Sequence, residues 1–150
     1  MKMTDMQASI GLAQLGKIGK FVKKRNENHN LLTERFKVFE KYFIMPVATL
    51  NSSPSWFGFV LTVRNSAPFK REEIIKYLEE YKIASRFLFA GDVTKQPAYK
   101  DVKFKKPVSL RNSGIVMNNT FWIGCYPAIN KRIIQYIVKV FEEFLSKYEK

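Results

Sequence analysis

Hydrophobic side chains in the first third of the chain recur every three or four residues, which is the period of an α-helix. Thr4 and Gln7 have the spacing of a capping box and predict the start of the first helix. Gly16 and Gly19 weaken a helix, so we expect a bend or a break there. A second helix should run from about residue 18 to residue 42. Its expected inward face consists of Phe21, Leu31, Leu32, Phe36 and Phe39.

The rest of the chain mixes strand and helix patterns. From Trp56 to Arg64 apolar residues alternate with smaller or polar ones, which predicts a strand. Similar reasoning predicts strands over residues 83–87 and 120–124, helices over residues 71–81 and 112–119, and a last helix capped by Asn130. The residues expected in the core are Phe57, Phe59, Leu61, Ile74, Leu78, Trp122, Ile123, Ile137, Phe141 and Phe144.

This order of elements predicts an α/β two-layer sandwich, in which a three-stranded, mainly antiparallel sheet carries helices on one face. A long bent helical segment precedes the sheet. We divide the chain at residue 45, into a helical segment over residues 1–45 and a small α/β domain over residues 46–150.

Composition narrows the class of protein. The chain has 150 residues, of which 46% are hydrophobic and 15% aromatic, and this is typical of a globular domain. No apolar run is long enough to span a membrane, and the first residues lack a secretory signal, so we expect a cytoplasmic protein. One cysteine, Cys125, and one histidine, His29, exclude an intrachain disulfide and a cysteine or histidine metal cluster. We expect His29 to be exposed and without function, and Cys125, like Trp56, to lie in the core.

The net charge of +13 raises the question of an anionic partner. The tightest basic clusters are residues 20–25 and 103–106, and neither is a long run. Lysines are instead spread along the whole chain, which favours solvated helix faces over a nucleic-acid site. A free-standing basic module that binds nucleic acid or an anionic surface stays as an alternative.

The segment from Ser85 to Asp92, followed by residues 96–99, combines an arginine, two phenylalanines, a glycine and a Gln-Pro pair. Such residues in a connection are typical of a binding surface carried by a rigid scaffold. The alternative is a hydrophobic plug beneath a surface loop.

Several segments, in collinear order over nearly the whole chain, resemble the DegT/DnrJ/EryC1/StrS sugar aminotransferase family of pyridoxal-phosphate fold type I. These segments are residues 4–15, 53–59, 86–91, 96–99, 119–124 and 126–127. They are most similar to the lipopolysaccharide-biosynthesis branch, the CDP-4-keto-6-deoxy-D-glucose 3-dehydrase type. The chain departs from that branch at Lys70, at Asp92 and over residues 128–130.

The resemblance implies a C-terminal small domain, whose helical segment over residues 1–45 links to a large domain that is missing here and lies upstream in the family. In the family, the lysine or histidine over the cofactor, and the cysteines that hold an iron–sulfur cluster in some dehydrases, lie upstream. By resemblance this chain therefore contains no catalytic residue and binds no cofactor, and is inactive alone. It would be a truncated gene product, a fragment, or half of a split protein. The full-length parent would use pyridoxal or pyridoxamine phosphate.

The parent reaction, by resemblance, removes the C3 hydroxyl of a nucleotide-linked 4-keto-6-deoxyhexose, and transamination is the near alternative. In this domain the resemblance assigns substrate contacts to Arg86, facing phosphate or hydroxyl groups, and to Phe57 and Phe89, lining the sugar pocket. Gly91 would permit a close approach of the backbone. We also expect a homodimer, because apolar residues of the first helix and of the 86–99 loop would stay exposed without the partners that cover them in relatives. We expect no nucleic acid as partner, because the lysines are scattered. An adapter that docks onto another protein is a further possibility.

Overall fold

The computed structural model describes residues 2–105 and 108–149, so the last lysine of the basic cluster over residues 103–106 lies outside the described residues. The helices and strands described are α1 (Asp5–Leu15), α2 (Ile18–Phe36), β1 (Phe43–Ile44), β2 (Gly58–Val63), α3 (Arg71–Glu80), β3 (Ser85–Phe87), α4 (Arg111–Asn119), β4 (Thr120–Gly124) and α5 (Lys131–Leu145). Short 3₁₀ helices span Lys37–Phe39, Val93–Lys95, Pro97–Tyr99 and Ser146–Tyr148.

The strands form one four-stranded sheet in the order β1-β2-β4-β3, and all neighbouring pairs are antiparallel. The predicted α/β two-layer sandwich is confirmed, but the sheet has one strand more than the three expected. The additional strand, β1, is only two residues long, which is too short for an alternating pattern to stand out.

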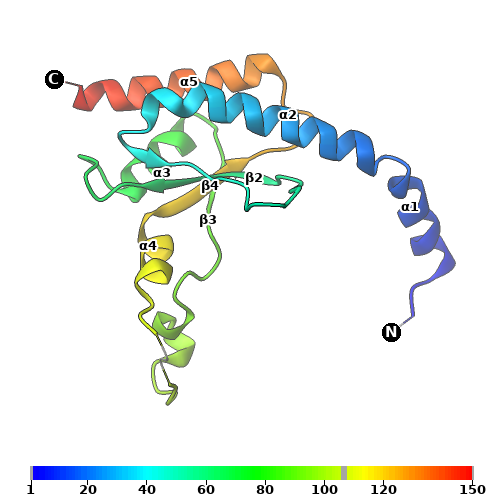
Figure 1. Ribbon diagram of the computed structural model, residues 1–150, viewed down its shortest axis with the longest axis horizontal. Coiled ribbons are helices and arrows are strands. Elements are labelled where there is room, and N and C mark those ends of the chain that lie inside the picture. The colour runs from blue at the N-terminus through cyan, green and yellow to red at the C-terminus, as the bar shows by residue number, and fades with distance from the viewer. Residues whose placement is uncertain (1, 106–107, 150) are drawn as a thin grey trace.

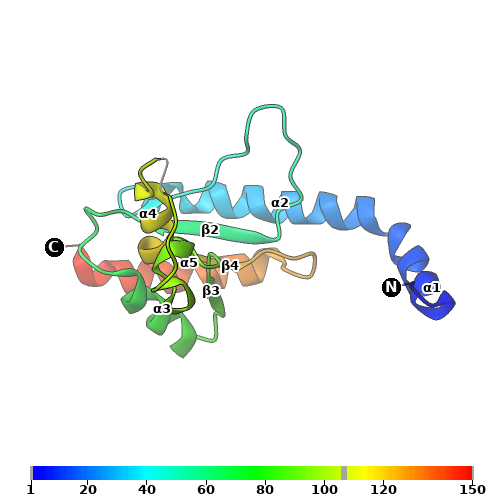
Figure 2. The ribbon, with the colours of Figure 1, turned by 90° about the horizontal axis from the view of Figure 1, so that it is seen from below.

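Helices α2, α3 and α5 form a layer on one face of the sheet (Figure 1). Phe36 of α2 lies at the centre of the core between the two layers. Its ring centroid is 5.1 Å from that of Phe59 in β2 and 4.8 Å from that of Phe141 in α5. Figure 2 looks onto the opposite face of the sheet, which these helices leave uncovered.

Helix α1 stands apart from this body (Figure 1). The capping box between Thr4 and Gln7 is present, and the helix ends at Leu15, next to Gly16, as the glycines predicted. None of its residues is buried. Helix α2 begins at Ile18 but ends at Phe36, earlier than predicted, and passes into a 3₁₀ turn.

Helix α2 and strand β1 contribute Leu32, Phe36 and Phe43 to the same core as the sheet. The helical segment over residues 1–45 is therefore packed against the rest of the chain along its second half. That this segment also connects to a large domain stays a prediction.

Several expectations about burial are wrong. Phe57, expected in the core, is 58% exposed, and Phe21 is 39% exposed because it lies on the part of α2 that extends beyond the sheet (Figure 1). His29, expected on the surface, is only 4% exposed. Cys125 is buried as predicted, whereas Trp56 and Trp122 are half-buried.

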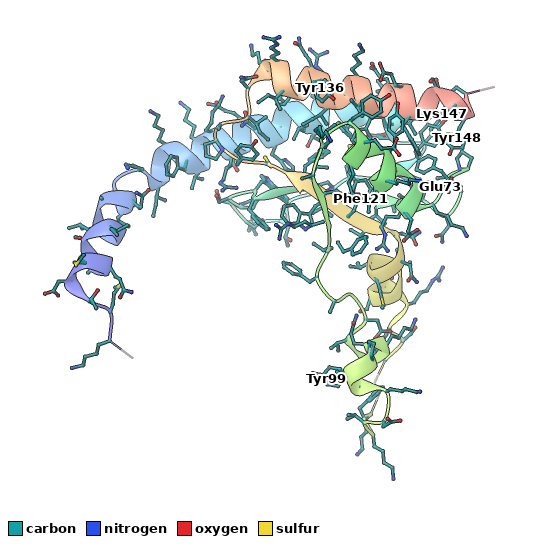
Figure 3. All side chains as sticks on the ribbon, turned by 180° about the vertical axis from the view of Figure 1, so that it is seen from behind. Glu73, Tyr99, Phe121, Tyr136, Lys147 and Tyr148 are labelled. Atoms are coloured by element: carbon teal, nitrogen blue, oxygen red, sulfur yellow. The ribbon has the colours of Figure 1, made fainter. Side chains whose placement is uncertain are left out.

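After β3 the chain leaves the sheet as an arm, which we define as residues 88–105 and 108–119. Figure 3 shows its direction: Tyr99 lies far out on the arm, away from Tyr136 and Lys147 in the helix layer. Within the described part of the chain, no helix combines the length and the apolarity needed to cross a membrane.

Candidate functional site

The uncovered face of the sheet brings together side chains from three strands. Trp122 in the central strand β4 lies opposite Val60 of β2 on one side and opposite Arg86 of β3 on the other. Directly opposite residues in antiparallel strands point to the same face. Phe57, just before β2, joins them with its ring centroid 4.7 Å from that of Trp122. We call Phe57, Val60, Arg86 and Trp122 the open face.

A glycine makes room for the large aromatic side chain of the open face. A Cβ atom at position 58 would lie 2.6 Å from Cε3 of Trp122, closer than real Cβ contacts allow. Gly58 therefore lets the indole of Trp122 lie across strand β2, next to Phe57. Any larger residue at this position would push the indole away from the sheet.

The open face suits a ligand with both sugar and phosphate groups. Arg86 is exposed, and its planar guanidinium can donate two parallel hydrogen bonds to a phosphate. The flat rings of Phe57 and Trp122 offer apolar surface beside it. The four residues of the open face include no carboxylate, imidazole or thiol, so they can bind and orient a substrate but cannot exchange protons with it.

The other two predicted site residues lie in the arm rather than on the sheet. Phe89 is 82% exposed and has a positive φ of 51°. Gly91 has a φ of 61°, and its tight contact is with Met117 of α4, not with an open surface. The side chain of Gln96 donates to the carbonyl of Ala90 at 2.9 Å and so ties this turn together.

The structure thus places Phe57 and Arg86 on one surface and gives Phe89 and Gly91 a separate setting. Phe87 and Phe89 are both more than half exposed, so these phenylalanines do not form a buried plug. Trp122 was expected in the core and was missed as a candidate site residue. Gly58 and Gly124, which pair directly beside it, were the available signal, because paired glycines leave space above a sheet.

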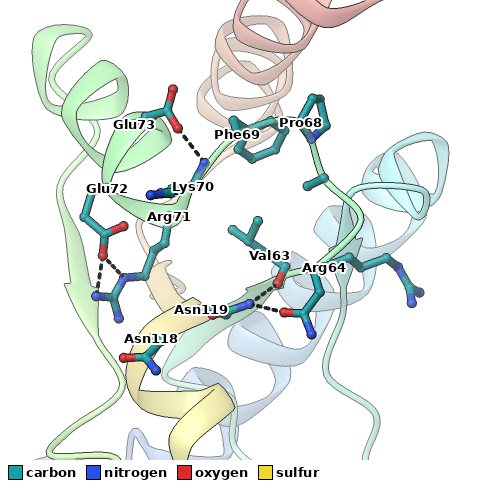
Figure 4. Close-up of a pocket in the computed structure, with 12 residues that line it drawn as sticks. Val63, Arg64, Pro68, Phe69, Lys70, Arg71, Glu72, Glu73, Asn118 and Asn119 are labelled. Carbon is teal, nitrogen blue, oxygen red and sulfur yellow. Dashed lines mark hydrogen bonds and ion pairs between the residues drawn. The ribbon is translucent and has the colours of Figure 1, made fainter.

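A hollow of about 580 Å³ lies at the surface at the start of α3 (Figure 4). Its polar groups bind one another. The side-chain amide of Asn119 donates to the carbonyl of Val63 at 2.9 Å, Glu73 accepts from the amide of Lys70, and Arg71 pairs with Glu72. Since charges of both signs line this hollow, we assign it a structural role in joining β2, α3 and α4.

The residues of the open face do not fit pyridoxal phosphate. Enzymes hold this cofactor through an amine, with a carboxylate or an arginine at the ring nitrogen. His29, the single histidine, is buried on the helix side of the sheet and its ring is stacked on that of Trp56. Burial lowers the pKa of His29 from 6.5 to about 4, so the imidazole is neutral near pH 7.

The fold defines the class of protein. An aminotransferase from Psychrobacter cryohalolentis has a TM-score of 0.87 to this chain, at 17% identity over 99% of it and 40% of the other chain. A solved GDP-4-keto-6-deoxymannose-3-dehydratase has a TM-score of 0.81, at 23% identity, covering 90% of this chain and 34% of the other. The structure is therefore a portion of the aminotransferase fold.

Sequence comparison identifies the family. The model of the DegT/DnrJ/EryC1/StrS aminotransferase family matches residues 1–142, and the chain belongs to this family. It is 42% identical, over 97% of its length, to the lipopolysaccharide biosynthesis protein RfbH of Salmonella typhimurium. It is 40% identical, over 98% of its length, to the dTDP-4-dehydro-2,6-dideoxy-D-glucose 3-dehydratase of Saccharopolyspora spinosa. The chain spans about a third of the length of these two relatives, 33% and 32%.

Proposed function

We propose that this chain acts as the C-terminal, substrate-binding small domain of a nucleotide-sugar 3-dehydratase that depends on pyridoxal or pyridoxamine phosphate and serves lipopolysaccharide synthesis. The observation that carries the proposal is the identity of 42% and 40%, over nearly the whole chain, to RfbH and to a named 3-dehydratase. The aminotransferases among the solved structures share the fold, so transamination is the alternative.

In this proposal the open face contacts a nucleotide-linked 4-keto-6-deoxyhexose. Arg86 binds a phosphate oxygen, while Phe57 and Trp122 pack against the sugar and exclude water from one side of it. Phe89 would reach the same ligand only from the arm. The cofactor would be held by residues from outside the open face, and it would supply the electron sink for this reaction.

An iron–sulfur cluster in such an enzyme would need cysteines from elsewhere. Cys125 is buried, and burial raises the pKa of its thiol to about 11, so the thiolate that a cluster requires is disfavoured.

A binding measurement on the chain tests the proposed contacts. We would titrate CDP, dTDP and GDP separately and follow the indole N–H signals of the two tryptophans by NMR. The signal of Trp122 should shift in a saturable way with at least one nucleotide, and Arg86→Ala should weaken that binding on the order of tenfold. Lys139→Ala is the matched control, because Lys139 is an exposed cation on α5 in the helix layer.

An activity measurement tests the reaction. The chain would replace the matching third of the Saccharopolyspora spinosa 3-dehydratase, and 3-dehydration by the chimera would be measured. We expect Arg86→Ala to lower the activity of the chimera by about an order of magnitude and Lys139→Ala to leave it unchanged. A folded chimera whose activity is indifferent to Arg86→Ala, together with an unshifted Trp122 signal, would contradict it.

A further inference from the structure

Helix α2 holds the ends of the two central strands through polar side chains. Nη1 of Arg25 donates to the carbonyl of Trp56 at 3.2 Å and to that of Cys125 at 2.7 Å. The side-chain amide of Asn28 donates to the carbonyls of Tyr126 and Ile129, at 2.9 and 3.0 Å. These carbonyls lie just before β2 and in the turn that follows β4, outside the strands themselves.

The next residue of α2, His29, holds a side chain of the same segment. Its ring stacks on Trp56 with the centroids 4.0 Å apart and the planes at 7°, and its edge meets the ring of Phe59 at 5.3 Å. We call Arg25, Asn28 and His29 the α2 clamp. Arg25 therefore binds the carbonyl of Trp56, and His29 packs against its ring.

Holding Trp56 has a consequence for the residue that follows it. Trp56 and Phe59 both contact His29, although they are three positions apart and regular strand alternation would put them on opposite faces. The alternation is interrupted between them. Phe57, which would otherwise point to the same side as Phe59, instead lies against Trp122 on the open face.

We propose that Arg25 and His29 are positioning residues for the open face: by keeping Trp56 against α2, they turn Phe57 outward to pack beside Trp122. The inference rests on the proposed function, because the packed pair of rings is the surface offered to the sugar. Neither residue touches the ligand in this arrangement. Both act through the backbone and the ring of Trp56.

The environment of the clamp supports a positioning role over simple packing. Arg25 is half-buried yet directs a charged group at two carbonyls, and charge-assisted hydrogen bonds of this kind fix geometry strongly. His29 is 4% exposed, and burying an imidazole costs free energy that an apolar residue would not. A flat ring is what the near-parallel stack on Trp56 requires.

The test uses the ligand-free chain first. In the wild type, NOEs between the rings of Phe57 and Trp122 should be strong. His29→Leu removes the flat ring and should weaken them, while His29→Phe, which restores a flat ring, should preserve them. Arg25→Met keeps the apolar stem, removes both hydrogen bonds and lies at a half-exposed position, so it gives a second variant if His29→Leu does not fold. Val140→Ala is the control, because it removes two buried methyl groups from α5, away from the clamp.

Nucleotide binding is measured on the same variants with dTDP, CDP and GDP. For whichever nucleotide the wild type binds, affinity should fall on the order of fivefold in His29→Leu and Arg25→Met and stay unchanged in Val140→Ala and His29→Phe. Unaltered ring NOEs in both clamp variants would overturn the inference. Lost NOEs without nucleotide binding by the wild type would uphold the positioning and overturn the proposed ligand instead.

Discussion

Gly91 in the arm lies directly against Met117 of helix α4. A Cβ atom at position 91 would overlap the side chain of Met117 and lie 2.6 Å from its Cα. The φ of Gly91 is 61°, a conformation that other residues rarely adopt. The root of the arm is therefore fixed to α4 at a point where only glycine fits, and this determines the direction in which Phe89 is presented.

We expect Gly91→Ala to destabilise the fold by about 2–4 kcal/mol, because backbone strain and overpacking add. Gly114→Ala is the matched control. Its Cβ would meet only Nζ of Lys95, at 3.7 Å, and an alanine in the helix should be neutral or stabilising by about 0.5–1 kcal/mol. Urea unfolding of both variants measures the difference, and equal midpoints would contradict the packing described for Gly91.

Phe141 gives a prediction about the core. It is fully buried against Phe36 and Phe43, so Phe141→Ala should cost about 3–5 kcal/mol of unfolding free energy. Phe57→Ala removes the same side chain from a 58% exposed site and should cost less than about 1 kcal/mol. A loss for Phe141→Ala below about 1 kcal/mol in urea melts would show that α5 is not packed in this way.

His29 predicts a pH dependence of stability. Its pKa is lowered to about 4 in the folded state, so the unfolded chain, with a pKa of 6.5, binds the proton more tightly. Stability from this residue is complete above pH 6.5 and is lost as the pH falls toward 4. Between pH 7 and 5 the wild type should lose about 2 kcal/mol that His29→Phe does not lose. Parallel stability curves for the two proteins would contradict the burial of a neutral imidazole.

We expect no stable binding of pyridoxal phosphate by the chain alone, because the open face supplies a guanidinium but no amine or carboxylate. The many surface lysines will form reversible adducts, so the measurement is the visible absorbance of the cofactor after mixing and exhaustive dialysis. A retained chromophore at one equivalent per chain would contradict the prediction.

Self-association is expected through α1 and the arm. The accessible surface is 11125 Å², whereas about 7,900 Å² is typical of a compact monomer of this mass. Met6 and Phe89 are 80% and 82% exposed, and patches of this kind tend to associate. A symmetric homodimer is the simplest outcome.

Sedimentation across a concentration series should show that dimer, and Phe89→Glu should weaken it. Val38→Glu, at another exposed apolar residue just after α2, is the control and should leave it unchanged. A wild-type chain that stays monomeric at high concentration would exclude the homodimer. An unchanged dimer in Phe89→Glu would place the interface elsewhere.

The elements with strong local signals could be predicted from the sequence. The capping box at Thr4 starts α1, the side chain of Asn130 accepts from the amide of Ile133 at the start of α5, and β4 covers the residues expected. These signals are local, because a cap or a period of two depends on residues a few positions apart. The α/β fold class could be predicted from these local signals.

The errors at Phe57, His29 and Trp122 depend on contacts between distant segments. Phe57 was assigned to the core from alternation, and the interruption arises from Arg25 and His29, about 30 positions earlier in the chain. His29 looks like a surface residue among its polar neighbours until Trp56 is placed over it. Trp122 has the sequence context of a core residue, and only the pairing of β2 with β4 shows that it faces outward.

The position of β4 in the sheet affects how the chain folds while it is being translated. Of the four strands that the structure describes it is synthesised last, yet it lies between β2 and β3 and pairs with both. Until residue 124 has emerged, β2 and β3 each keep an unpaired edge, the kind of surface that recruits other chains. Since Lys131–Leu145 must follow before the helix layer closes, the nascent chain stays vulnerable to aggregation until this helix has also emerged.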